Sequence, residues 1–306
     1  MFEEVLKRGL FTAVVLSVML FYGCDRFEGD QTLPAWLEVD TIYLGNNPNL
    51  EEGVLTHNIT DVWVYVDDQL LGAWELPASI PVLAEGVHKL MLTPGIKLNG
   101  MSGTRSPYIF LRPKTYENFM FTIDSVVKRN PTVQFYDNID FAWMEDFSDA
   151  SFRLKETSNS DTTMTRIFHN PASPGLGVAS GAGYTDAAHP VFEVTTWSEE
   201  EPGLFLPSGS QPVIMEMEYQ CNTSLLVGMF IYEVSIGIKQ HAILVLNPTG
   251  EGVWKKIYVN LTPTINDYFN ADYYNVFFRA EKVSEAETDW VYLDNLKIIH
   301  RQTTSQ

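Results

Sequence analysis

The chain has 306 residues, of which 45% are hydrophobic, and its 39 acidic and 20 basic residues give a formal net charge of −19. This length suggests about two domains, each with a sizeable core. A surface with so large an excess of acid repels phosphate backbones, which excludes nucleic acid as an expected partner.

The N-terminal 23 residues have the pattern of an export signal. Two basic residues precede an apolar run over residues 10–22, which Gly23 and Cys24 follow. A short apolar run behind positive charges is typical of a secretory signal, and this one is shorter than the roughly 20 residues that a membrane-spanning helix needs. The cysteine directly after Gly23 makes the segment resemble a bacterial lipoprotein signal. That resemblance implies cleavage before Cys24 and a lipid on Cys24, so we expect an anchor in a membrane.

Residues 24–35 are short, polar and acidic, and we interpret them as a tether between the lipid and the first folded unit. In Bacteroidetes-type bacteria, acids soon after the lipidated cysteine resemble the signal that directs lipoproteins to the cell surface. In enterobacterial lipoproteins, an aspartate at the position of Asp25 would instead imply retention at the inner membrane. The expected location is the bacterial cell envelope, at the outer membrane or the cell surface.

The sequence holds two cysteines, Cys24 and Cys221. If Cys24 is acylated, no intramolecular disulfide can form, so the folded part depends on its core alone. Cys221 alternates with Met215, Met217 and Tyr219 on one face of an expected strand. We interpret Cys221 as a small core residue and not as a nucleophile.

Residues 36–129 are predicted to form a first, small β-sandwich. Residues 62–66 read Val-Trp-Val-Tyr-Val, five strand-forming residues in succession, and a turn with a return strand follows over residues 67–76. Pro77 then marks a loop or a sheet edge, and another alternating strand covers residues 87–92. This order of features resembles small β-sandwich modules of the immunoglobulin or PEGA type, in which the corresponding residues are structural.

Residues 130–301 are predicted to form a larger, second sandwich, followed by a polar tail at residues 302–306. An opening strand at residues 141–147 precedes clear strand patterns at residues 191–195, 213–221, 225–233, 242–246, 256–261, 274–280 and 291–299. About eight strands suit a two-sheet jelly roll. Because no helix-period segment of useful length follows the signal, we expect an all-β chain of two tandem sandwiches.

Three motifs make the second unit resemble jelly-roll carbohydrate-binding modules and related lectin-like domains of exported bacterial proteins. They are the opening Glu145-Asp146-Phe147, the strand at residues 254–261, and the closing aliphatic–Asp–Asn–aliphatic pattern around Asp294. In that family the opening acid and the closing aspartate often meet and bind a structural Ca²⁺, which takes six to eight oxygen ligands. The resemblance implies Glu145, Asp146 and Asp294 as metal ligands. The alternative is that Asp294 only accepts backbone N–H bonds at a turn.

A glycan site needs exposed aromatic rings beside amide and carboxylate groups. The chain has 7 Trp, 14 Tyr and 18 Phe, although most aromatic residues of a sandwich belong to its core. Trp197 lies in a polar segment, Tyr184 in an expected loop, and Tyr268 among aspartates and asparagines. We predict a ligand-binding patch drawn from Trp197, Tyr184 and Tyr268.

No catalytic motif is evident. The six histidines lack zinc-type spacing, and no Gly-x-Ser-x-Gly elbow is present. The glycine-rich residues 175–183 lack the lysine and helix of a phosphate-binding loop, so we interpret them as a surface loop. A glycosidase needs two opposed carboxylates, but among 39 acids some pair would arise by chance.

The leading expectation is a lipid-anchored envelope or surface protein, not an enzyme, that binds a glycan through its jelly roll. One alternative is a structural accessory subunit of an envelope secretion or adhesion complex, since open sheet edges and faces favour protein contacts. A second alternative is a glycoside hydrolase on the jelly-roll scaffold.

Overall fold

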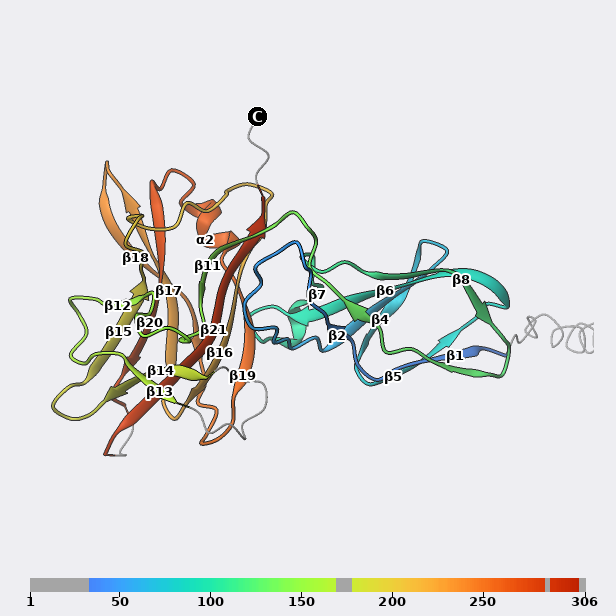
Figure 1. Cartoon of the computed structure of the whole chain (residues 1–306), viewed down its shortest axis with the longest axis horizontal. Helices are drawn as coiled ribbons and strands as arrows, with labels where there is room; N and C mark the ends of the chain where they lie inside the picture. Colours follow the sequence, from blue (N-terminus) through green and yellow to red (C-terminus); the bar gives the residue numbers. More distant parts are fainter. Residues whose placement is uncertain (1–32, 169–177, 284–286, 303–306) are drawn as a thin grey trace, which may run out of the picture.

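The structure is a computed structural model that describes residues 33–168, 178–283 and 287–302. It consists of two β-sandwiches joined end to side, the smaller N-terminal one and the larger jelly roll (Figure 1). The all-β class and the two sandwiches predicted from the sequence are confirmed. The export signal, Cys24 and most of the tether lie outside the described residues. Within the described part, no helix is long and apolar enough to cross a membrane.

The N-terminal domain is built around a sheet in which β4, β3, β6 and β7 are neighbours and β8 also pairs with β6. The predicted hairpin joins β3 to β4 through Asp67 and Asp68, whose φ angles of 50° and 64° suit a two-residue hairpin turn. Two smaller sheets, β5-β1-β9 and β10-β2, complete the sandwich. The strands are β1 Ala35–Val39, β2 Tyr43–Leu44, β3 Asp61–Val66, β4 Gln69–Glu75, β5 Ala78–Val82, β6 Gly86–Lys97, β7 Arg105–Pro107, β8 Lys114–Phe121, β9 Val126–Lys128 and β10 Thr132–Val133.

The jelly roll has two facing sheets, which we call the β21 sheet and the β20 sheet. The β21 sheet has the order β13-β14-β21-β16-β19, with β11 also paired to β21, and the β20 sheet has the order β12-β15-β20-β17-β18. A six-residue helix, α2 Thr262–Asp267, follows β19. The strands are β11 Ile139–Glu145, β12 Leu154–Glu156, β13 Thr165–Phe168, β14 Ala179–Thr185, β15 Val191–Thr196, β16 Val213–Cys221, β17 Leu225–Glu233, β18 Gly237–Leu246, β19 Lys255–Asn260, β20 Tyr273–Glu281 and β21 Asp289–Arg301.

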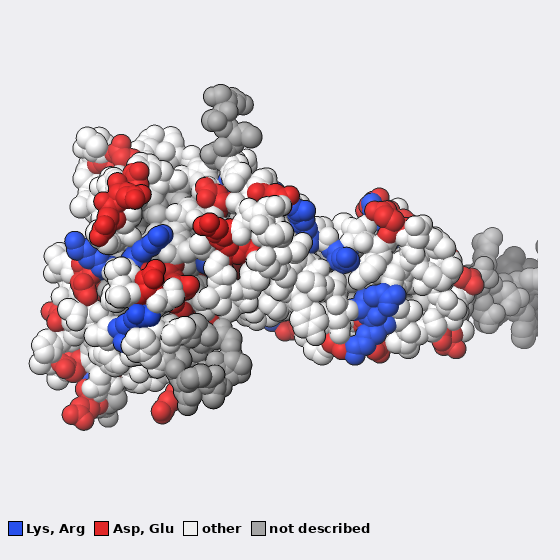
Figure 2. Space-filling view, in the orientation of Figure 1, with Lys and Arg blue, Asp and Glu red and all other residues white. Residues whose placement is uncertain are grey.

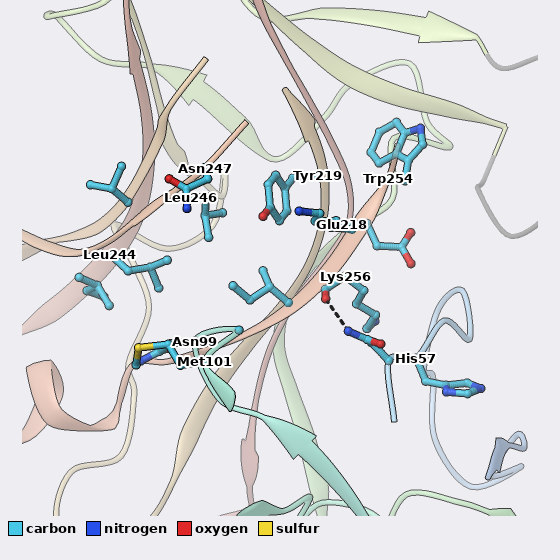
Figure 3. Close-up of a pocket in the computed structure, with 16 residues that line it drawn as sticks. His57, Asn99, Met101, Glu218, Tyr219, Leu244, Leu246, Asn247, Trp254 and Lys256 are labelled. Atoms are coloured by element: carbon cyan, nitrogen blue, oxygen red, sulfur yellow. Dashed lines mark hydrogen bonds between the residues drawn. The ribbon is translucent and has the colours of Figure 1, made fainter. Parts of the chain in front are cut away.

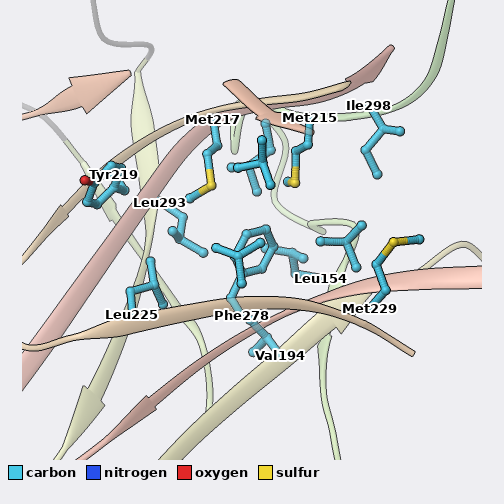
Figure 4. Close-up of a cluster of buried hydrophobic side chains, with 14 of the residues drawn as sticks. Leu154, Val194, Met215, Met217, Tyr219, Leu225, Met229, Phe278, Leu293 and Ile298 are labelled. Carbon is cyan, nitrogen blue, oxygen red and sulfur yellow. The ribbon is translucent and has the colours of Figure 1, made fainter. Parts of the chain in front are cut away.

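The main core fills the space between the two jelly-roll sheets. Figure 4 shows Met215 and Met217 of β16 facing Phe278 of β20 across this space. Cys221 is fully buried in the same cluster and is a free thiol whose pKa is raised by burial. The interpretation of Cys221 as a core residue is therefore confirmed.

The glycine-rich segment is one place where the structure corrects the sequence interpretation. From Ala179 onward it forms β14, a buried strand rather than a surface loop. A Cβ on Gly181 would lie 2.5 Å from the ring of Phe147, and one on Gly183 would lie 2.3 Å from the ring of Phe192. The glycines are there because two core rings pack directly on the strand backbone.

The N-terminal domain covers the free edge of β19. Leu98 forms a parallel bridge with Tyr258, and the Asn99 amide donates to the Tyr258 carbonyl at 2.7 Å. The side chain of Asn58 donates to the Lys256 carbonyl at 3.1 Å. This domain thus occupies an edge that would otherwise expose unpaired backbone groups.

The two domains also share a core. Ile214, Tyr258 and Ile299 lie on the outer face of the β21 sheet, yet they belong to the hydrophobic cluster of the N-terminal domain. Val133 of β10 and Ile139 at the start of β11 belong to the same cluster. The N-terminal domain and the jelly roll therefore form one continuous packed unit.

Candidate functional site

The three residues predicted as metal ligands are placed at the end of β11 and in the middle of β21. The carboxylate of Glu145 accepts the backbone N–H groups of Phe147, at 2.6 Å, and of Arg153. Asp294 is buried and accepts the Ser180 hydroxyl at 2.9 Å. Burial raises the pKa of Asp294 to about 7, and the nearby carboxylates of Glu218 and Asp146 add to this effect.

Glu145 and Asp146, two of the three predicted ligands, line a small cavity of about 230 Å³ together with Asn295. The amide oxygen of Asn295 is buried without a hydrogen-bond partner, and the residue has a φ of 46°, in the left-handed region. An amide oxygen and two carboxylates are ligand types that Ca²⁺ accepts. Asp294 does not line this cavity, and the described residues contain no group of three or more His, Cys, Asp or Glu that could hold a metal ion. A calcium site at these residues stays a prediction.

Trp197 lies at a second cavity, of about 380 Å³, which we call the Trp197 cleft. It directly follows β15, and its backbone N–H donates to the Arg153 carbonyl at 2.9 Å, which fixes the residue beside β12. The indole side chain is 37% exposed, and the Lys155 ammonium lies 5.5 Å from the ring centroid. Phe205, another exposed ring, lines the same cleft.

Several kinds of polar side chain that can bond to hydroxyl groups line the same cleft. His300 and Asp140 approach each other to 3.6 Å across the β11–β21 pair. The polar residues that line the Trp197 cleft are Asp140, Arg153, Ser198, Glu201, Asn275 and His300. The cleft therefore combines two exposed aromatic side chains with carboxylate, guanidinium, amide and imidazole groups.

A stacked pair of tyrosines adjoins this cleft. The rings of Tyr232 and Tyr273 are parallel within 20°, with centroids 4.4 Å apart, on the outer face of the β20 sheet. Gly203, which lines the cleft, packs so closely on Tyr273 that a Cβ would lie 2.3 Å from its ring. The aromatic surface thus continues from the cleft onto the β20 sheet.

The other two residues of the predicted patch lie elsewhere. Tyr184 belongs to β14 and not to a loop, and its ring centroid is 6.4 Å from that of Tyr292. Tyr268 follows α2, where the Lys239 ammonium lies 4.6 Å from its ring centroid. No hydrogen bond or ring contact in the described part of the chain joins Trp197, Tyr184 and Tyr268, so the structure does not bring them together.

The sequence pointed to Trp197 but missed its neighbours. Phe205 sits in an apolar stretch typical of core residues, and Asp140 and His300 are separated by most of the jelly roll in the sequence. Only the pairing of β11 with β21 places these two side by side. The aromatic pairing of Tyr232 with Tyr273 likewise depends on the register of β17 and β20.

No protein-family model matches the chain, and no curated protein matches it. Among solved structures, it is similar to the CBM22-1 xylan-binding domain of Xyn10C from Paenibacillus barcinonensis, with 10% identity over 54% of this chain and 97% of that one, at a TM-score of 0.37. It is also similar to TmCBM61 in complex with β-1,4-galactotriose, with 14% identity over 52% of this chain and 92% of that one, at a TM-score of 0.32.

A third similar structure is that of carbohydrate-binding modules from the β-sandwich superfamily with promiscuous specificity. It shares 11% identity over 88% of this chain and 99% of that one, at a TM-score of 0.39. These neighbours are β-sandwich carbohydrate-binding modules.

Proposed function

We propose that the jelly roll binds a glycan in the Trp197 cleft. The observation that carries this proposal is the partly exposed indole of Trp197 beside the exposed ring of Phe205 in a cavity rich in hydrogen-bonding groups. Pyranose rings offer C–H faces that pack on aromatic side chains and hydroxyl groups that bond to carboxylates, amides and guanidinium groups. The Tyr232–Tyr273 pair extends the aromatic surface for further sugar units.

The charge of the site favours a neutral glycan. The carboxylates of Asp140 and Glu201 line the cleft together with the guanidinium group of Arg153. Their charges, with that of Lys155 at the Trp197 ring, leave no net positive charge at the site, and the whole chain carries a net charge of −19. Acidic side chains are also scattered over the face of both domains shown in Figure 2. An anionic polysaccharide would be repelled by this field, whereas neutral hydroxyl groups gain charge-assisted hydrogen bonds.

The proposal includes a lipid anchor at Cys24, which would hold the protein at the outer membrane or the cell surface. Its support is the sequence pattern of the signal and of the acidic tether. Labelling of cells with radioactive palmitate tests it directly. We expect the label on the full chain and its loss in Cys24→Ala, and a label that persists in Cys24→Ala would refute the anchor.

Binding, not catalysis, is the role that this combination of groups supports best. A glycan array probed with the full chain and with Trp197→Ala tests the proposal. Trp36→Ala is the matched control, since Trp36 on β1 is 36% exposed and lies in the other domain. We expect neutral glycans bound by the wild type and by Trp36→Ala and lost in Trp197→Ala. A blank array, or equal loss in both variants, would contradict it.

A further inference from the structure

A large groove follows the open side of the jelly roll, between the edge strands of its two sheets. Its volume is about 880 Å³, and most of its lining comes from residues 243–247 at the end of β18 and residues 254–257 at the start of β19 (Figure 3). Residues 57–58 and 99–101 of the N-terminal domain also line it. Successive side chains of a strand point to opposite faces of its sheet. A cavity that meets consecutive residues of both strands therefore runs along their edges and not over a sheet face.

The two strand edges differ in what already covers them. The backbone edge of β19 is met by Leu98 and by the side chain of Asn58 from the N-terminal domain. Among the described strands, β18 pairs only with β17, so its other edge is open along 10 residues. Such edges are usually short, charged or covered, because their unpaired N–H and C=O groups attract another strand.

The side chains along this edge are suited to a protein partner. Ile238 and Val245 of β18 are exposed apolar residues, and Val245 is 59% exposed. Inside the groove, the lining on one side of β19 includes the partly buried Leu244 and the jelly-roll core residues Leu246 and Tyr219 (Figure 3). A strand that added to β18 would bury alternate apolar side chains there, and its backbone would satisfy the open edge.

Charge distinguishes between possible occupants. Glu218 and the Lys256 side chain, both in the lining, are buried, whereas Lys255 at the start of β19 is exposed. A second copy of this chain, whose net charge is also −19, would be repelled at long range, whereas a short segment responds mainly to the charges within about 10 Å of it. A strand that places a carboxylate beside Lys255 would gain a favourable charge interaction.

We propose that this groove binds an extended segment of another protein, with alternating apolar residues and at least one acid, which pairs with the open edge of β18. Binding by strand addition takes its affinity from main-chain hydrogen bonds and its specificity from alternate side chains. This interaction is separate from the glycan site, because the Trp197 cleft shares no lining residue with the groove.

The test is selection of a phage-displayed library of nine-residue peptides, alternating apolar and random positions, on the full chain. The selected peptide is then synthesised and titrated by calorimetry against variants. Val245→Lys places a charge on the open edge, and Val126→Lys is the matched control, since Val126 on β9 is 60% exposed. Trp197→Ala serves as the control for the glycan site.

We expect acidic binders whose affinity falls at least about tenfold, or 1.4 kcal/mol, in Val245→Lys and in Lys255→Glu, and stays unchanged in Val126→Lys and Trp197→Ala. Hydrogen exchange should slow in β18 when the peptide binds. The proposal is overturned if the library yields no binder or if the affinity of the binder is the same in Val245→Lys. It is also overturned if a neutral glycan, and not the peptide, slows hydrogen exchange in β18. A dimer seen by light scattering that Val245→Lys dissociates would show that a second copy occupies the groove instead.

Discussion

Tyr108 of the N-terminal domain donates a hydrogen bond to the carboxylate of Glu216 in β16 of the jelly roll, and both side chains are buried. Glu216 also forms an ion pair with Lys256 at 2.6 Å. Burial alone would raise the pKa of Glu216, but the ammonium groups of Lys256 and Lys297 hold it below its usual range. Lys297 in turn donates to the Val54 carbonyl at 2.7 Å. This network joins the two domains through buried charge.

The first prediction concerns this junction. Glu216→Ala leaves the Lys256 ammonium buried without its partner, so we expect a loss of about 3–5 kcal/mol in the free energy of unfolding. Tyr108→Phe removes one donor and should cost about 1–3 kcal/mol. Urea denaturation of the full chain measures both, with Lys89→Ala as the control. Lys89 pairs with Asp68 on the surface, where a loss above about 1 kcal/mol is not expected. Equal effects in all three variants would contradict the network.

The second prediction concerns the close packing on β14. Gly183→Ala would place a Cβ 2.3 Å from the buried ring of Phe192. Overpacking of this kind typically costs about 1–3 kcal/mol, and thermal unfolding should show it as a lower Tm. Gly103→Ala is the control, because no atom lies within 4 Å of its Cβ position. A Gly183→Ala variant as stable as Gly103→Ala would show that the ring does not rest on the strand.

The third prediction follows from the carboxyl group of Asp294, whose pKa of about 7 lies above the ordinary value of 3.8. The folded state therefore binds this proton more tightly than the unfolded state does. The protonated carboxyl group of Asp294 stabilises the folded state fully below about pH 4. This stabilisation is lost as the pH rises through 7, a change of about 4 kcal/mol in the free energy of unfolding. Asp294→Asn should flatten the stability profile between pH 4 and 7, whereas the exposed control Asp68→Asn should not. A wild-type profile with no decline in this range would be inconsistent with a buried, protonated Asp294.

The fourth prediction tests the calcium site. Ca²⁺ should raise the Tm of the wild type, a chelator should remove the increase, and added Ca²⁺ should restore it. Because the Asn295 amide oxygen and the Asp146 carboxylate line the same cavity, Asn295→Ala and Asp146→Asn should abolish the effect. Asp161→Asn, outside that cavity, should retain it. A melting curve that neither Ca²⁺ nor chelator changes would rule the metal out.

Much of the fold could be predicted because its strands are regular in sequence. The predicted strands at residues 213–221 and 225–233 coincide with β16 and β17, since hydrophobic alternation reports directly on a buried face. The helix α2 has only six residues, too few for a helical period to be visible. Strand β14 was missed because its glycines are explained only by Phe147 and Phe192, which lie elsewhere in the sequence.

Only part of the candidate site could be predicted, because strands that are distant in the sequence bring its residues together. Trp197 was visible in a polar segment, but its partners come from strand pairing that local patterns do not encode. The junction left one trace in the sequence. Ile214 and Ile299 are apolar at positions whose side chains face away from the jelly-roll core, and they are buried by the N-terminal domain. A strand that is apolar on both faces is typical of burial on both sides, and here the N-terminal domain provides the second covering layer.

The most direct test of the glycan-binding account is calorimetric titration of the full chain with neutral oligosaccharides. The probes are the neutral oligosaccharides that the glycan array identifies. Each lost ring contact should weaken binding about tenfold, or 1.4 kcal/mol. We expect measurable binding that falls by this factor in Trp197→Ala, Phe205→Ala and Tyr273→Ala and is unchanged in Trp36→Ala. Binding that survives all three substitutions, or no heat with any neutral glycan, would contradict it.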